Sequence, residues 1–378
     1  MSDISKRILL YKSLEKLREN PLIVYITSSR IGVPGLMASD MLEELTDQIE
    51  KIPEDQEEVD FLIESSGGDP LVAWRAISLL RTRFKKINVL IPNIAFSAAT
   101  LLALGADEIV MGKYACLGPI DPQIMVKNQQ DGSEKKFAYE DVLSLFRFTK
   151  KEVGLTEQKY AQKIFELLSE KVEPIALGFA MRASSLSYEI GVKLLLTHMS
   201  SATGKTKARE IAKRLNKNFF SHGHALYRKE AKKYGLKIVN ASEEEDDIMW
   251  KIHKSLNKDL ETNKPFNLIT EFFSNPAGNQ YLKSSPVVSI PAGANPQLVN
   301  QIFTQHIQAQ LQQSSPDVEI EVKVALLESV RLSLEYKEKA KILVVRTIDL
   351  KHIARAVVLK SGWCKIKMPK IKIIKKSN

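Results

Sequence analysis

Short apolar runs rich in β-branched residues alternate with helix-patterned segments over the first 260 residues, and this alternation constrains the fold most. The strand-like runs lie at 21–27, 59–63, 87–91 and 108–111, and the helix-like segments at 36–52, 71–84 and 98–104. Strands that are joined through helices of this length form parallel sheets with right-handed crossovers. The sequence therefore predicts an α/β fold built on a parallel sheet.

The pattern changes twice along the chain. The segment 139–216 loses the strand signal and is predicted to be a helical insert, after which a short helix (227–234) and one more strand (236–239) follow. Between Lys283 and Asp317 no side chain is charged, which is typical of a linker or boundary. Strand patterns at 318–324, 342–345 and 356–359 come after it. We expect two units: residues 1–260, and a smaller β-rich C-terminal unit, 261–378.

The net charge of +10 is confined to the C-terminal end of the chain. From position 341 onward the chain contains 11 of its 55 Lys and Arg residues and a single acidic residue, Asp349. The first 340 residues therefore carry 44 positive and 44 negative charges. This balance argues against a polyanion-coating role for most of the surface. The basic tail, 365–376, is predicted to be a solvated edge strand or a disordered tail, and the alternative is a contact with nucleic acid or an acidic membrane.

The location of the protein is predicted from its cysteines and its apolar stretches. Two cysteines, Cys116 and Cys364, exclude a disulfide scaffold or a cysteine-built zinc site and suit a reducing cytosol. The start of the chain is typical of an amphipathic helix, and the longest apolar stretch, 95–106, is shorter than the ~20 residues that span a bilayer. We expect a cytoplasmic protein without a transmembrane segment, a metal site or a cofactor.

Two loops carry residues suited to acyl-transfer chemistry. The sequence ESSGGDP at 64–70 follows a strand, and its glycines permit positive φ angles and outward N–H groups. Ser97 opens a helix of small residues, where the hydroxyl and the N–H of Ala98 lie at the positive end of the helix dipole. Taken singly, such features are ordinarily a turn and an N-cap. Together, the N–H groups of Gly67 or Gly68 and of Ala98 are suited to stabilise an oxyanion.

Four motifs in this region together resemble the serine dehydrogenase proteinase family, a branch of the Clp-fold serine proteinases related to Clp protease and signal peptide peptidase A. They are SGGD at 66–69, SAAT at 97–100, ADEI at 106–109 and LGPIDPQ at 117–123. The resemblance covers roughly residues 15–240. It implies a Clp/crotonase-like fold and an intracellular serine-type endopeptidase that hydrolyses peptide bonds.

The same resemblance implies a Ser-Asp-His triad. Ser97 takes the nucleophile position, Asp121 the acid position, and Gly67, Gly68 and Ala98 the oxyanion positions. His222 matches the family's histidine best, and His224 is the second choice. The fold usually forms oligomers, so a homo-oligomer acting on protein or peptide substrates is expected. No ATPase signature occurs in the chain, so any unfoldase or regulator would be a separate partner.

Three other functions stay open at this point. A crotonase-type acyl-CoA enzyme uses the same oxyanion amides and needs no serine at position 97. A catalytically weak or dead interaction module is kept open because Gly223 and Ala225 replace the Asp and Pro that commonly follow the family's histidine. A Ser-Lys dyad, as in the signal peptide peptidases, would use Lys163 or Lys193 as the base.

Overall fold

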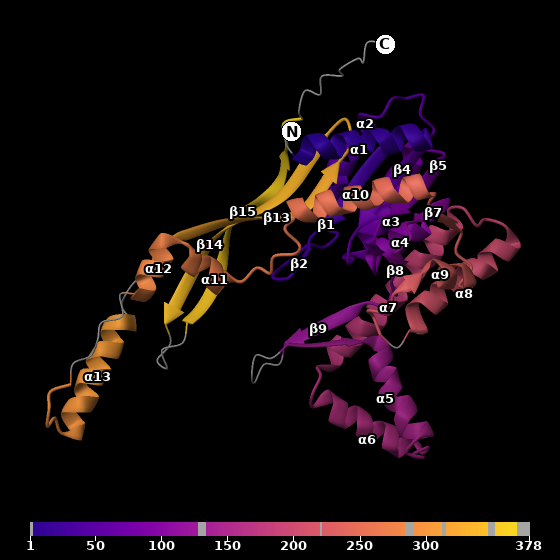
Figure 1. Ribbon diagram of the computed structural model, residues 1–378. Coiled ribbons are helices and arrows are strands. Elements are labelled where there is room, and N and C mark those ends of the chain that lie inside the picture. The colour runs from indigo at the N-terminus through magenta and orange to yellow at the C-terminus, as the bar shows by residue number, and fades with distance from the viewer. Residues whose placement is uncertain are drawn as a thin grey trace, which may run out of the picture.

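A computed structural model describes residues 3–127, 134–219, 221–283, 290–311, 315–346 and 352–368 (Figure 1). Its centre is a parallel sheet in the order β12-β7-β5-β4-β1, which confirms the predicted α/β fold. The strands are β1 (Leu22–Thr27), β4 (Glu58–Glu64), β5 (Lys86–Ile91), β7 (Glu108–Met111) and β12 (Ile238–Asn240). Their apolar runs are nearly continuous because helices cover both faces of the sheet.

Alternate residues of each strand face two different helical layers. Phe61 and Ile63 pack with α2 (Met41–Glu50), α3 (Pro70–Arg83), α4 (Ala98–Leu104), α7 (Pro174–Leu196) and α8 (Ala202–Lys217). Leu62 packs on the opposite face with α1 (Asp3–Arg18) and α10 (Glu243–Asp259). The period-two alternation of a strand accounts for this division of the core.

A small three-stranded sheet lies beside the carboxyl ends of the parallel strands. It pairs β8 (Cys116–Leu117) with β6 (Ile94–Ala95) in parallel and with β11 (Leu226–Tyr227) antiparallel. Because of these directions, the chain leaving β6, the chain leaving β8 and the chain entering β11 meet at one edge. The short helix α9 (Arg228–Lys233) follows β11.

The segment 139–216 is helical, as predicted, but a hairpin that the sequence pattern did not reveal precedes it. Strands β9 (Gln123–Lys127) and β10 (Glu134–Ala138) pair antiparallel before α5 (Tyr139–Lys151), α6 (Gln158–Ser169), α7 and α8. The EKKFA sequence of β10 is mostly polar and does not alternate cleanly, so it gave no strand signal. Among the described residues, no helix is both long and apolar enough to cross a bilayer.

The C-terminal strands extend the central sheet. β13 (Val318–Glu328) pairs antiparallel with β1, and β14 (Ser333–Arg346) and β15 (His352–Lys365) follow. These three long strands form a ribbon that projects from the body, with α11 (Leu268–Ser274), α12 (Pro276–Lys283) and α13 (Pro296–Leu311) near its far end (Figure 1). The division at residue 260 stays a prediction, since one sheet runs across it. The part of the basic tail from position 369 onward lies outside the described residues.

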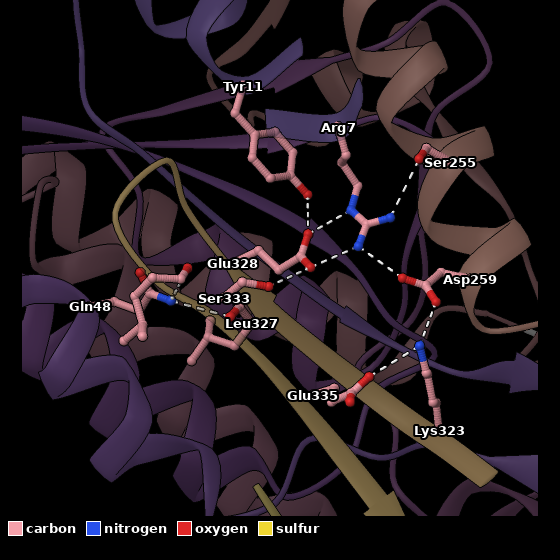
Figure 2. Close-up of polar contacts among 11 residues, drawn as sticks. Arg7, Tyr11, Gln48, Ser255, Asp259, Lys323, Leu327, Glu328, Ser333 and Glu335 are labelled. Carbon is pink, nitrogen blue, oxygen red and sulfur yellow. Dashed lines mark hydrogen bonds and ion pairs between the residues drawn. The ribbon is translucent and has the colours of Figure 1, made fainter. Parts of the chain in front are cut away.

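A buried ion pair joins the N-terminal helix α1 to β13, the first strand of the C-terminal ribbon (Figure 2). The guanidinium of Arg7 donates to both carboxylate oxygens of Glu328, at 2.6 and 2.7 Å, and both side chains are fully buried. The Tyr11 hydroxyl donates to the same carboxylate at 2.6 Å, and Asp259 accepts from Arg7 at 2.9 Å. Lys323 bonds Asp259 at 2.6 Å. Helices α1 and α10 are thereby fixed to the start of the C-terminal ribbon.

Candidate active site

Ser97 has a strained backbone at the junction between β6 and α4. Its φ of +52° and ψ of −116° are unusual for a residue with a side chain, a conformation that costs about 1–3 kcal/mol. It stands at the N-cap position of α4, yet its side chain makes no capping hydrogen bond. The hydroxyl is therefore not committed to the capping role that a serine at a helix start usually has.

The glycine loop after β4 lies directly against Ser97. A Cβ atom at Gly67 would lie 2.7 Å from the Ser97 Cβ and 2.9 Å from the Phe96 carbonyl oxygen, and Gly67 has a φ of +114°. The backbone of Met37 brackets the loop, since its N–H donates to the Gly67 oxygen at 2.8 Å and its carbonyl accepts from the Asp69 N–H at 2.9 Å. Only glycine permits this close approach.

The hydrogen bonds of the loop distinguish its two glycines. The N–H of Gly67 donates to the Ser65 hydroxyl oxygen at 3.1 Å, and the Ser65 hydroxyl lies 2.7 Å from that of Thr27. Within the described chain, the N–H groups of Gly68 and Ala98 donate no hydrogen bond. Of the three predicted oxyanion positions, Gly68 and Ala98 thus keep available donors, and Gly67 does not.

Ser65 is a supporting residue that the sequence analysis did not single out. It is 1% exposed, and its hydroxyl also lies 3.4 Å from the Gly67 carbonyl oxygen. A serine at the end of a buried strand, immediately before a glycine loop, was the available signal, because small hydroxyl side chains often bond the backbone of the next turn.

Asp121 and His222 form a hydrogen-bonded pair. The Nδ1 atom of His222 lies 2.9 Å from Oδ1 of Asp121, and the two side chains are 23% and 16% exposed. The chain segment before Asp121 is fixed because the Ile120 N–H donates to the Leu215 carbonyl oxygen at 3.0 Å. Residues 101 positions apart in sequence therefore meet beside the edge where β6, β8 and β11 bring their chain ends together.

The second-choice base, His224, has other partners. Its Nε2 lies 3.2 and 3.3 Å from the two carboxylate oxygens of Glu230, and its ring lies 4.7 Å from that of Phe219. The Nε2 atom that would accept a proton from a serine is thus already bonded to a carboxylate. This arrangement is suited to holding the loop against α9.

Two further histidines are bonded away from Ser97. The Nε2 atom of His198 lies 2.9 Å from the Leu104 carbonyl oxygen, and burial lowers the pKa of this histidine. The Nδ1 atom of His253 lies 2.7 Å from the buried Glu64 carboxylate. The His198 contact joins the end of α7 to α4, and the His253 contact joins α10 to β4, which indicates a structural role for both.

The two halves of the site are not hydrogen-bonded to each other. Among the described residues, no hydrogen bond joins the Ser97 hydroxyl to His222. The two lysines considered as alternative bases have other contacts, since Lys163 is exposed and paired with Glu166 at 3.2 Å, and Lys193 lies over the Trp74 ring at 5.8 Å. The described residues contain no group of three or more His, Cys, Asp or Glu side chains that could hold a metal ion.

Comparison with known proteins identifies the same part of the chain. Residues 3–142 match the sequence model of a family described as ClpP-like SDH-type serine proteinases. This confirms, over those residues, the resemblance that the motifs predicted, and it includes Ser97, both glycines and Asp121.

Two curated relatives are uncharacterised proteins of Methanocaldococcus jannaschii. One is 27% identical over 249 residues, which are 62% of this chain and 72% of the relative. The other is 26% identical over 262 residues, which are 66% and 78% of the two chains.

Among solved structures, the chain is similar to a substrate-bound form of the 1510-N membrane-bound stomatin-specific protease, with 16% identity, a TM-score of 0.35 and coverage of 60% and 78% of the two chains. It is also similar to ClpP1 from Listeria monocytogenes, with 13% identity, a TM-score of 0.29 and coverage of 61% and 97%. Both scores are low, so the ClpP-like fold is assigned from the family match and the sheet.

Proposed function

We propose that the chain is a serine endopeptidase of the ClpP-like SDH type, with Ser97 as nucleophile, His222 as general base and Asp121 as the orienting acid. The single observation that carries the proposal is the Asp121–His222 pair. An Nδ1–H that donates to the Asp121 carboxylate leaves the lone pair on Nε2, which is the tautomer that a general base needs. The family match covers Ser97 and Asp121, and the motif resemblance supplies the expectation that a histidine paired with Asp121 serves Ser97.

The proposed reaction depends on Ser97, on His222 and on the backbone N–H groups beside Ser97. The serine oxygen attacks the carbonyl carbon of the scissile peptide while His222 accepts the hydroxyl proton, and Asp121 stabilises the resulting imidazolium. The carbonyl oxygen becomes an oxyanion that the free N–H groups of Gly68 and Ala98 stabilise. Losing one such donor typically costs about 10²–10³ in turnover. His222 then donates the proton to the leaving amine, and water hydrolyses the acyl-enzyme.

The proposal includes formation of the Ser97–His222 hydrogen bond when substrate binds or subunits assemble, since catalytic hydrogen bonds are often long before that stage. Assembly into a homo-oligomer is supported by the apolar surface of the insert. Phe148, Phe165 and Phe179 are 56%, 48% and 54% exposed. A groove of about 790 Å³ between β9 and α7 adds Met125 and Leu186 to this surface. Apolar surface of this extent is typical of protein interfaces.

Two finer points complete the proposal. Both cysteines are free, Cys116 buried and Cys364 exposed, which supports a reducing compartment such as the cytosol. Unfolding of large substrates would require a separate ATPase or regulator, because the chain has no ATPase signature of its own.

Labelling with a fluorophosphonate probe tests the site, because the probe reacts with an activated serine. We expect the wild-type protein to be labelled, Ser97→Ala to be unlabelled, and His222→Gln to be labelled at least about 10²-fold more slowly, in line with loss of a general base. His224→Gln is the matched control on the same loop and keeps the labelling rate, since His224 is bonded to Glu230.

The outcomes separate the alternatives. Absence of labelling in the oligomeric wild-type protein contradicts an active peptidase and favours the interaction module. An equal loss of labelling rate in His222→Gln and His224→Gln contradicts the assignment of His222 as the general base. Turnover of acyl-CoA thioesters that survives Ser97→Ala points to the crotonase-type enzyme.

A further inference from the structure

The last strand of the central sheet has an open edge. β15 has 14 residues, and among the described residues no strand pairs with its outer side. Its sequence, HIARAVVLKSGWCK, contains neither proline nor an acidic residue. A row of unpaired N–H and C=O groups of this length is a template for a further strand, and natural proteins usually shorten or interrupt such edges.

Two cations of β15 lack the counter-charges that the cations of β14 have, whereas Lys365 at the end of β15 pairs with Asp47 at 3.4 Å. On β14, Lys337, Lys339 and Lys341 pair with Glu321, Glu319 and Asp317 at 3.0, 2.5 and 2.5 Å. On β15, Arg355 and Lys360 are exposed and have no acidic partner among the described residues. Lys360 lies directly opposite Lys339 in the strand register. Like charges opposite one another are destabilising, so an acid on the outer side of Lys360 would be favourable.

Apolar side chains lie between these two cations. Val357, Val358 and Leu359 are 45%, 54% and 50% exposed. A β-bulge falls here, since Lys339 pairs with Lys360 and Ala340 with Val358, so Leu359 has no direct partner on β14. Along the edge, Arg355 is therefore followed by the apolar cluster of Val357, Val358 and Leu359 and then by Lys360.

We propose that the open edge of β15 binds an extended, acidic segment of another protein by strand addition. Main-chain hydrogen bonds would supply the affinity, and alternating acidic and apolar side chains would meet Arg355, Lys360 and the apolar cluster. A second copy of the chain is a poorer occupant, because two β15 strands would bring cations together without a single acid between them. Nucleic acid offers neither the backbone pairing nor apolar side chains for Val357 and Leu359.

Fluorescence anisotropy with labelled peptides tests this binding. The full chain carrying Ser97→Ala is used, so that the result is independent of peptidase activity. A peptide that alternates Glu with Val is expected to bind, and its Lys–Val counterpart is not. The same Glu–Val composition interrupted by prolines is expected to lose most of the affinity, because proline cannot pair with an edge.

Charge reversal identifies the edge. Arg355→Glu with Lys360→Glu is expected to weaken the Glu–Val peptide about tenfold and to create binding of the Lys–Val peptide, since two exposed ion pairs are replaced by two repulsions. Lys205→Glu with Lys207→Glu on α8 is the control, because it changes the net charge equally on exposed residues elsewhere.

Three results would overturn the proposal. Equal binding of the proline-interrupted peptide would show attraction by charge alone, as a nucleic-acid or membrane surface would give. Equal weakening in the α8 control would place the binding elsewhere. A shift from dimer to monomer caused by the β15 variant in the absence of peptide would identify a second copy as the occupant.

Discussion

Removing one charge from the buried ion pair at the root of the ribbon is expected to destabilise the whole molecule. The carboxylate of Glu328 is fully buried and accepts four hydrogen bonds, two from Arg7, one from Tyr11 and one from Ser333 at 2.8 Å (Figure 2). Although burial by itself opposes the charge, the hydrogen bonds and charge of Glu328 raise the pKa of Arg7 above its ordinary value. The replacement Glu328→Gln keeps the shape and removes that charge.

The loss of stability in Glu328→Gln follows from the contacts that Arg7 retains. Its guanidinium is 0% exposed and keeps only the carboxylate of Asp259 as a charged partner, while the new amide group of residue 328 places N–H donors against N–H donors. Breaking a buried pair in this way costs about 3–5 kcal/mol. For a cooperative unit of 378 residues, with an unfolding entropy of about 2.1 cal/mol/K per residue, this lowers Tm by about 4–6 °C.

Differential scanning calorimetry measures this shift. Glu321→Gln is the control on the same strand, since its pair with Lys337 is 53% and 27% exposed and is expected to change the free energy of unfolding by about 1 kcal/mol or less. The double variant Arg7→Met with Glu328→Leu removes both charges and is expected to lose less stability than Glu328→Gln, because no unpaired charge stays buried.

Two results would refute this reasoning. One is a Glu328→Gln shift no larger than that of Glu321→Gln, and the other is a double variant less stable than the single one. Two separate transitions, of which Glu328→Gln moves only one, would show instead that residues 261–378 unfold independently.

Two further predictions concern the site and the cysteines. Gly67→Ala is expected to slow fluorophosphonate labelling about 10²-fold, since the new Cβ would lie 2.7 Å from the Ser97 Cβ and displace it. Gly223→Ala is the control and is expected to keep the labelling rate, because its new Cβ would lie 3.7 Å from the nearest atom. A Gly67→Ala variant that is labelled at the wild-type rate would contradict the packing argument. Burial raises the pKa of Cys116 from 9.0 to about 11. The stabilisation from its neutral thiol is therefore present below pH 9 and is lost as the pH rises towards 11. Iodoacetamide at neutral pH should alkylate Cys364 alone until the protein unfolds, and early Cys116 alkylation, read by mass spectrometry, would contradict this.

Several parts of the fold follow from local sequence. The predicted helix 98–104 and strand 108–111 coincide with α4 and β7, because a run of apolar residues carries its periodicity within itself. The positive φ of Ser97 has no such signal, and it occurs where the backbone lies against Gly67, a residue remote in sequence. The hairpin β9–β10 was missed for a related reason. Each of its strands is held by hydrogen bonds to the other strand, and the composition of neither strand indicates this pairing.

The candidate site was only partly predictable. Motifs pointed to Ser97, Asp121 and the glycine loop, and the family resemblance ranked His222 above His224, but the residues that follow His222 depart from the family pattern. The partners of the two histidines differ in the folded chain, Asp121 for one and Glu230 for the other. The catalytic role of His222 stays a prediction that this contact supports.

By itself, the sequence determined the parallel α/β body, the serine at a helix start and the location of the excess charge, because all three depend on residue types at short spacing. Only the tertiary structure decided which glycine keeps a free N–H, which histidine meets Asp121 and which cations lack a counter-charge. These properties depend on distances between residues that are remote in sequence. Burial and hydrogen bonding set such distances after the strands have paired, and no local pattern encodes them.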